Sequence, residues 1–191
     1  MNTAERLIQS TQQLLWERGY VGTSPKAIQQ RAEAGQGSMY HHFTGKQDLA
    51  LQAIRRSAEQ LCSEAAERLS SPGTSYERIA AYLLRERDVL RGCRIGRLAA
   101  DPDIVASPTL RAPLEETFTW LNDRIRELLV EGRERGEFSE ALVPADAATA
   151  ITAVVQGGYV LAMSAGTAEP FERAVRGALN LLTAHLTGGQ E

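Results

Sequence analysis

The chain has 191 residues, 43% of them hydrophobic, and a formal net charge of -3. This composition provides enough apolar side chains for a packed core, and it excludes a disordered protein and one that coats nucleic acid along its whole length. No apolar run approaches the roughly 18 residues that a membrane span needs, and the polar, amphipathic N-terminus does not resemble a signal peptide. We therefore expect a cytoplasmic protein with no membrane partner.

Charge is distributed unevenly along the chain. Residues 1 to 60 carry seven Lys and Arg against five Asp and Glu, which leaves 14 against 19 for the remainder. A mildly basic head on an acidic body indicates two functions on one chain. Cys62 and Cys93 are too few for a disulfide-stapled scaffold and have no His or Cys at metal-ligand spacing, so both are interpreted as buried thiols.

Three short helices are predicted at the N-terminus. Apolar side chains recur at helical spacing up to Leu15, and Gly19 supplies a stop. Ser24 is a suitable N-cap and Pro25 a suitable first residue for the second helix. After a break in "EAGQG", a third helix is expected at residues 36 to 42.

The rest of the chain continues as helices. A long fourth helix begins at Lys46, and the next is expected over residues 74 to 92, with Leu90 on its buried stripe. Further helices are expected in "IGRLAAD" and near residues 109 to 136, 145 to 165 and 170 to 187, with Pro102, Pro108 and Pro144 between elements. No stretch alternates at period two for long enough to form a strand. The pattern predicts an all-α protein of about nine helices.

The stretch "GQGSMYHHFTGK" carries the chemistry of the head. Two short helices joined by a tight turn form a helix-turn-helix unit, whose later helix enters the major groove of DNA. An amide such as Gln36 in its first turn can read a base edge, with adenine as the best match, and Gly37 permits close approach of the backbone. The predicted DNA-binding residues are Ser24, Lys26, Gln36, Gly37, Ser38, Tyr40, His41, His42 and Lys46.

Other interpretations of this stretch have less support. Adjacent His41 and His42 cannot both face one metal ion from a helix, where ligands recur at i, i+3 or i+4. Phe43 is expected in the core, holding the third helix against the first. Because no catalytic triad, Cys-His pair or glycine-rich phosphate loop is found, we expect no catalytic residues, no metal site and no cofactor. An all-helical small-molecule-binding enzyme and a protein-interaction bundle remain the alternatives, but neither explains the head.

The segment "SPKAIQQRAEAGQGSMYHHFTGKQDL" resembles the DNA-binding signature of TetR-family transcriptional regulators. The matching residues are Ile28, Ala32, Gly37, Tyr40, His42, Phe43 and Lys46, and the departures are Gln29, Glu33, Ala34 and Gly35. Because Glu33 falls in a turn that favours positive φ, we expect the turn to lie later in the chain, on Gly35. More weakly, "GCRIGRLAAD" is similar to the LmrA/YxaF-like subgroup.

The resemblance implies a regulator with two domains. These are a three-helix DNA-binding domain at residues 1 to 46 and a C-terminal helical ligand-binding and dimerisation domain at residues 47 to 191. The implied protein forms a homodimer through its last two long helices. Those helices also carry more apolar surface than one bundle layer needs, although both could simply be core. The predicted dimer interface consists of Gly158, Val175, Ala178 and Leu182.

A ligand pocket is expected in the body, where polar side chains line one side of an apolar helix. The predicted ligand-binding residues are Tyr82, Phe118, Leu121, Thr152, Gln156, Tyr159 and Met163. The alternative is that the polar tips bond to neighbouring helices. Since the body is acidic, the expected effector is apolar, aromatic or cationic. The sequence thus predicts a ligand-responsive repressor that binds a palindromic operator as a homodimer and is released by a small-molecule effector.

Overall fold

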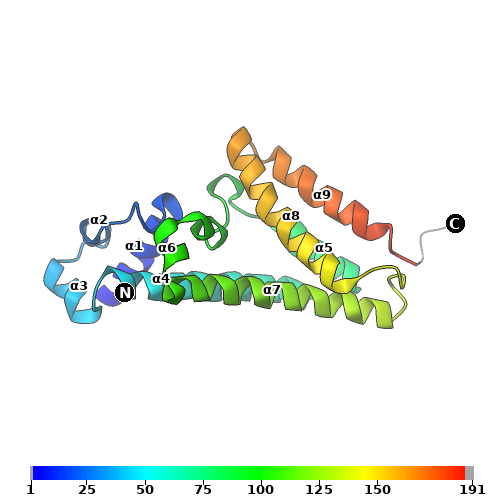
Figure 1. The fold of residues 1–191 in the computed structure, drawn as a ribbon, viewed down its shortest axis with the longest axis horizontal. Coiled ribbons are helices and arrows are strands. Elements are labelled where there is room, and N and C mark those ends of the chain that lie inside the picture. The colour runs from blue at the N-terminus through cyan, green and yellow to red at the C-terminus, as the bar shows by residue number, and fades with distance from the viewer. Residues whose placement is uncertain (1, 188–191) are drawn as a thin grey trace. The chain divides into compact units, whose positions relative to one another are not determined.

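A computed structural model describes residues 2 to 187 of the chain, and Figure 1 shows its helices in chain order. The α-helices are α1 (Thr3–Arg18), α2 (Pro25–Arg31), α3 (Gln36–His42), α4 (Lys46–Leu69), α5 (Ser75–Leu84), α6 (Pro102–Ala106), α7 (Pro108–Glu134), α8 (Pro144–Ala165) and α9 (Glu169–Thr183). Two 3-10 helices, η1 (Val89–Arg91) and η2 (Gly96–Ala100), lie between α5 and α6. Over residues 2 to 187 the only β-type pairing is an isolated bridge between Phe138 and Leu186. The predicted all-α class is confirmed.

The helices form two compact units. Unit 1 combines Met1–Leu61 with Cys93–Thr117, and unit 2 combines Cys62–Gly92 with Phe118–Glu191. Helices α4 and α7 each contribute residues to both units. The predicted domain boundary after residue 46 falls at the start of α4, within the first segment of unit 1.

Local signals in the sequence explain how unit 1 begins. The Asn2 side chain caps α1 by accepting from the Glu5 backbone N–H, and Gly19 ends that helix at φ 71°. The first helix buries Leu7 and Leu14 completely or nearly so. Phe43 is only 4% exposed, so its expected place in the core is confirmed.

The predicted helix over residues 74 to 92 is shorter than expected. Helix α5 ends at Leu84, Arg85 is extended with ψ 150°, and Leu90 is 49% exposed instead of buried. The helix ends here because the Arg87 guanidinium donates to the terminal carbonyls of Tyr82 and Leu83, at 2.6 and 2.5 Å. The expected last helix is also shorter, ending at residue 183. Residues 102, 108 and 144 begin helices and do not merely separate them.

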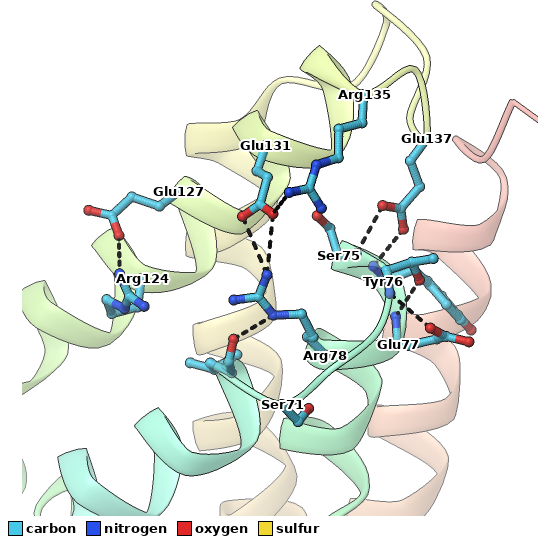
Figure 2. A network of polar contacts seen from close by, with 12 residues as sticks. Ser71, Ser75, Tyr76, Glu77, Arg78, Arg124, Glu127, Glu131, Arg135 and Glu137 are labelled. Atoms are coloured by element: carbon cyan, nitrogen blue, oxygen red, sulfur yellow. Dashed lines mark hydrogen bonds and ion pairs between the residues drawn. The ribbon is translucent and has the colours of Figure 1, made fainter.

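A polar network holds the start of α5 against the end of α7 in unit 2, as Figure 2 shows. The Glu137 carboxylate accepts from the backbone N–H groups of Ser75 and Tyr76 at 2.9 and 2.7 Å. Arg78 donates to the Leu69 carbonyl at 2.8 Å and pairs with Glu131 at 3.4 Å. A carboxylate at a helix N-terminus satisfies free N–H groups and complements the helix dipole, so Glu137 stabilises α5 from outside it.

Candidate nucleic-acid interface

Helices α2 and α3 form the helix-turn-helix geometry predicted for the head. The Ser24 hydroxyl accepts from the Ala27 N–H at 3.1 Å and thereby caps α2. Gly35 is the N-cap of α3, and its carbonyl accepts from the Met39 N–H at 3.2 Å. The bounds of α3 are those predicted for the recognition helix, residues 36 to 42.

The turn between these helices differs from the expectation. Glu33 adopts the left-handed conformation at φ 49°, whereas Gly35 has φ -72° and ψ 158°. The expected shift of the turn to Gly35 is therefore wrong. Because Gly35 must be extended to cap α3, the left-handed residue falls at Glu33, whose side chain is exposed. Its carbonyl accepts from the Arg6 guanidinium at 3.5 Å.

Helix α3 turns its polar residues outward and is held by two apolar ones. Met39 is fully buried and Phe43 nearly so. The predicted DNA-binding residues that are exposed are Ser24, Lys26, Gln36, Gly37, Ser38, Tyr40, His41 and His42. A Cβ added to Gly37 would meet no heavy atom within 4 Å, so packing within the protomer does not require a glycine there.

Lys46 is the exception among the predicted DNA contacts, because it is half-buried. Its Nζ donates to the Tyr20 carbonyl at 2.8 Å and lies 3.8 Å from the centroid of the Tyr20 ring. Burial lowers the pKa of Lys46, while the nearby carboxylates of Asp103 and Asp101 act in the opposite direction. Lys46 thus connects the loop after α1 to the start of α4, a role that the sequence did not suggest.

Asp101 fixes the same loop and was not anticipated. Its Oδ2 accepts from the backbone N–H groups of Tyr20 and Val21, at 2.7 and 3.0 Å. Its Oδ1 accepts from Asp103 and Ile104 and so caps α6. The only sequence signal was an Asp before Pro, which is typical of a helix start. Both functions of Asp101 lie within unit 1.

The predicted ligand-binding residues lie in unit 2 and differ in burial. Tyr82, Leu121 and Tyr159 are buried, whereas Phe118, Thr152, Gln156 and Met163 are half-buried. The Thr152 Oγ1 is a buried polar atom without a hydrogen-bond partner in the described part of the chain. The Tyr159 ring packs against Phe171 with the ring centroids 4.8 Å apart. A small-molecule pocket at these residues stays a prediction.

The predicted dimer residues lie on α8 and α9. Gly158 and Val175 are buried within unit 2, where a Cβ added to Gly158 would come within 2.9 Å of the Phe171 ring. Ala178 and Leu182 are also mostly buried but line an apolar surface groove between the two helices. The large apolar side chains that these helices expose are Val160, Leu161 and Leu181, which sequence reasoning did not name.

Comparison with known proteins decides the family. Residues 7 to 53 match the family described as "Bacterial regulatory proteins, tetR family", and residues 65 to 178 match "Tetracyclin repressor-like, C-terminal domain". The chain belongs to the TetR family. The resemblance seen in the sequence of the head is therefore confirmed, and members of this family are transcriptional regulators and not enzymes.

Individual TetR-family relatives cover most of the chain. The HTH-type transcriptional regulator LmrA of Bacillus subtilis is 25% identical over 176 residues, covering 88% of this chain and 90% of LmrA. The HTH-type transcriptional repressor NemR of Escherichia coli is 24% identical, covering 95% and 94%. A solved structure of a CifR cysteine mutant, complexed with a 26 bp double-strand operator DNA, is 22% identical, with a TM-score of 0.79 and coverage of 93% and 95%.

Helix α8 corrects one expectation from the sequence. It is long and apolar enough to cross a membrane by length and composition alone, with a mean hydropathy of 1.3, although no apolar run was expected to approach that length. Only 33% of the apolar window is buried within the protein. A core helix of a soluble protein passes the same test, so length and composition do not place α8 in a bilayer.

Proposed function

We propose that this TetR-family regulator is a cytoplasmic repressor that binds a palindromic operator as a homodimer and releases it when a small-molecule effector binds. The observation that carries the proposal is α3, a short helix with a buried apolar side and a polar side open to DNA. Relatives support it by name: NemR is described as a repressor, and CifR was solved with operator DNA.

DNA recognition is assigned to the start of α3. Gln36 and Ser38 are exposed in its first turn, and the free N–H groups of a helix start favour phosphate oxygens. Tyr40, which is 51% exposed, carries a hydroxyl suited to the DNA backbone. His41, His42 and Lys26 add donors around it. In this proposal the side chains position the protein on the phosphates, and Gln36 reads one base edge.

Dimerisation is assigned to the outward side of α8 and α9. Val160, Leu161 and Leu181 are 61%, 55% and 73% exposed, and a protein seldom leaves so many large apolar side chains on two neighbouring helices. Pairing of the two helices with their two-fold mates would bury them in a four-helix interface. The originally predicted Ala178 and Leu182 would lie at the edge of that interface, beside their groove.

Effector binding is assigned to the polar side of α8. Thr152, Gln156 and Tyr159 present polar atoms amid apolar neighbours, which suits an apolar, aromatic or cationic molecule with few polar groups. An effector changes DNA affinity only if it binds one conformation better than the other. Trp120, in α7, is half-buried and provides a fluorescence signal for such binding.

The test is a DNA-binding experiment with fragments that flank the protein's own gene. We expect the wild-type dimer to shift one fragment, to protect a palindrome whose half-sites lie about 34 to 36 Å apart or more, and to lose affinity steeply as salt rises. An effector should release this DNA and change Trp120 fluorescence over the same concentration range. Binding that proceeds equally on all fragments and ignores the α3 variant Gln36→Ala would contradict the proposal.

A further inference from the structure

We propose that a groove beside Arg87 in unit 2 is a binding site for a small organic carboxylate with an apolar or aromatic body. The groove has a volume of about 760 Å³ and is lined by the end of α5, the segment that follows it and α9. Its arginines are Arg85, Arg87 and Arg176. The proposal does not depend on the effector assigned to the polar side of α8.

The donors of Arg87 are only partly used. An arginine has five N–H donors in a fixed fork. In Arg87, Nη1 donates to the carbonyls of Leu83 and Arg85, and Nη2 donates to the Tyr82 carbonyl. The Nε atom is buried and has no hydrogen-bond partner among residues 2 to 187. Nε–H and one Nη2 hydrogen therefore remain, which are two donors on one guanidinium suited to the two oxygens of a carboxylate.

Arg87 has no carboxylate partner among the described side chains, and its only side-chain partners are the neutral aromatic residues Tyr82, Tyr159 and Phe171. The acidic residues of the groove are Glu86, Asp88 and Glu172, and the two with an ion pair use other arginines. Asp88 pairs with Arg91 at 3.8 Å and Glu172 with Arg176 at 3.7 Å. Burial lowers the pKa of Arg87, and the neighbouring Arg85 charge adds to this effect. A half-buried cation without a counter-ion is costly, and a bound anion would relieve that cost.

The walls of the groove indicate the rest of the ligand. Leu83, Phe171 and Val175 are buried apolar residues that line it, and Leu84, which also lines it, is 63% exposed. The Arg87 guanidinium lies 5.3 Å from the centroid of the Phe171 ring. A molecule whose carboxylate meets Arg87 would therefore place its body on Phe171 and Val175. This combination favours an aromatic or medium-chain aliphatic acid over a phosphate or an inorganic anion.

The groove is distinct from the surface assigned to dimerisation. Glu172 and Arg176 line it from one side of α9, whereas Leu181 lies on the apolar groove between α8 and α9. Five residues along a helix turn the side chain by about 140°, so Arg176 and Leu181 point in different directions. An alternative is that Arg87 only caps the C-terminus of α5. That role explains the contacts of its Nη atoms, but it does not explain the unpaired Nε donor or the adjacent groove.

The test measures binding directly, without DNA. Benzoate, cinnamate and octanoate are titrated into the wild-type protein by calorimetry, each beside its neutral amide. We expect at least one acid to bind with a millimolar or lower Kd and its amide to bind at least tenfold more weakly. Arg87→Gln should abolish this binding, and Arg87→Lys, which keeps the charge but not the fork, should weaken it about tenfold.

A second pair of variants covers the case in which loss of the α5 cap unfolds the Arg87 variants. Glu172 lines the groove, and the variant Glu172→Lys should bind the acid about three- to tenfold more tightly because it adds positive charge there. Its matched control is Glu169→Lys, an equal charge change on the same helix outside the groove, which should leave the Kd unchanged. The proposal is overturned if no acid binds with a Kd below about 10 mM or if acids and amides bind with the same affinity. It is also overturned if a folded Arg87→Gln variant binds the acid as well as wild type does, or if Glu172→Lys and Glu169→Lys have the same Kd for the acid.

Discussion

The ammonium group of Lys46 lies 2.8 Å from the carbonyl oxygen of Tyr20 and 3.8 Å from the centroid of its ring. One side chain thus contributes a charge-assisted hydrogen bond and a cation–π contact to the same residue. From the sequence, Lys46 is predicted only as a DNA-binding residue. Its half-buried setting adds a role within the fold.

This double role predicts that Lys46→Ala affects both stability and DNA binding. We expect a loss of about 1 to 2 kcal/mol in the free energy of unfolding, with weaker binding to all DNA sequences alike. The matched control is Lys26→Ala, which removes an exposed lysine from α2 and should weaken DNA binding without changing stability. Denaturant unfolding and the salt dependence of DNA affinity separate the two effects. An unchanged free energy of unfolding in Lys46→Ala would show that the contact with Tyr20 does not contribute to stability.

Gln36 is predicted to read a base. Gln36→Ala should reduce discrimination at one base pair of each half-site by about 1 to 3 kcal/mol while retaining non-specific affinity. Gln30→Ala is the control, since Gln30 is also exposed but lies on α2 outside the predicted contacts. Binding is measured over a library of single-base operator variants. If Gln36→Ala still binds DNA with the wild-type base preference at every operator position, Gln36 does not read a base.

Glu33 offers a stabilising substitution. At φ 49° it occupies a conformation that costs an L-residue about 1 to 2 kcal/mol, whereas glycine adopts it readily. Glu33→Gly should raise the free energy of unfolding by about 0.5 to 1 kcal/mol after the larger chain entropy of glycine is subtracted. Glu33→Ala keeps the Cβ and should give no such gain. Equal thermal unfolding of the two variants would mean that the side chain, and not the backbone conformation, sets the stability here.

Glu137 is predicted to contribute to the stability of unit 2 through the start of α5. In Glu137→Gln one oxygen can still accept, but the amide NH₂ would face the second N–H group. We expect a loss of about 1 to 2 kcal/mol in the free energy of unfolding. Glu134→Gln makes the same chemical change at an exposed position of α7 and should have little effect. Chemical denaturation of both variants provides the comparison.

Leu181, at 73% exposure, tests the dimer. Leu181→Glu should produce folded monomers that no longer bind the operator, because two carboxylates would be buried in the proposed interface. The exposed Leu90 lies outside α8 and α9, so Leu90→Glu should remain dimeric. Light scattering at micromolar protein concentration measures the molar mass and thus the oligomeric state of each variant. A wild-type monomer, or a dimeric Leu181→Glu, would exclude this interface.

Prediction from the sequence succeeded where the signals were local. The bounds of α3 and the burial of Phe43 follow from neighbouring residues and from a signature that spans only two helices. The end of α5 was missed because no Gly or Pro marks it, and the group that ends it is the side chain of Arg87. Gly158 and Val175, which are predicted for the dimer interface, are buried within unit 2, and helical spacing alone does not distinguish a core from an interface.

Contacts distant in sequence were out of reach altogether. The hydrogen bonds from the backbone of Tyr20 and Val21 to Asp101 join residues about 80 positions apart. Neither segment contains a sequence pattern that indicates the other as its partner. Likewise, the positive φ at Glu33 depends on Gly35 being used as a cap. Residue type alone favours Gly35 over Glu33 for the left-handed position, and the structure has the opposite arrangement.

Asp101 has a consequence for protein engineering. The simplest chimera would join the first three helices of this chain to the body of another regulator, with a single cut after the third helix. Here such a cut would separate Tyr20 and Val21 from Asp101, which accepts their backbone hydrogen bonds. It would also remove the Asp101 carboxylate from Gly19, where an added Cβ would lie 2.8 Å from that carboxylate. The transplantable part of this regulator is therefore discontinuous, and a working chimera should carry residues 93 to 117 along with the first 61.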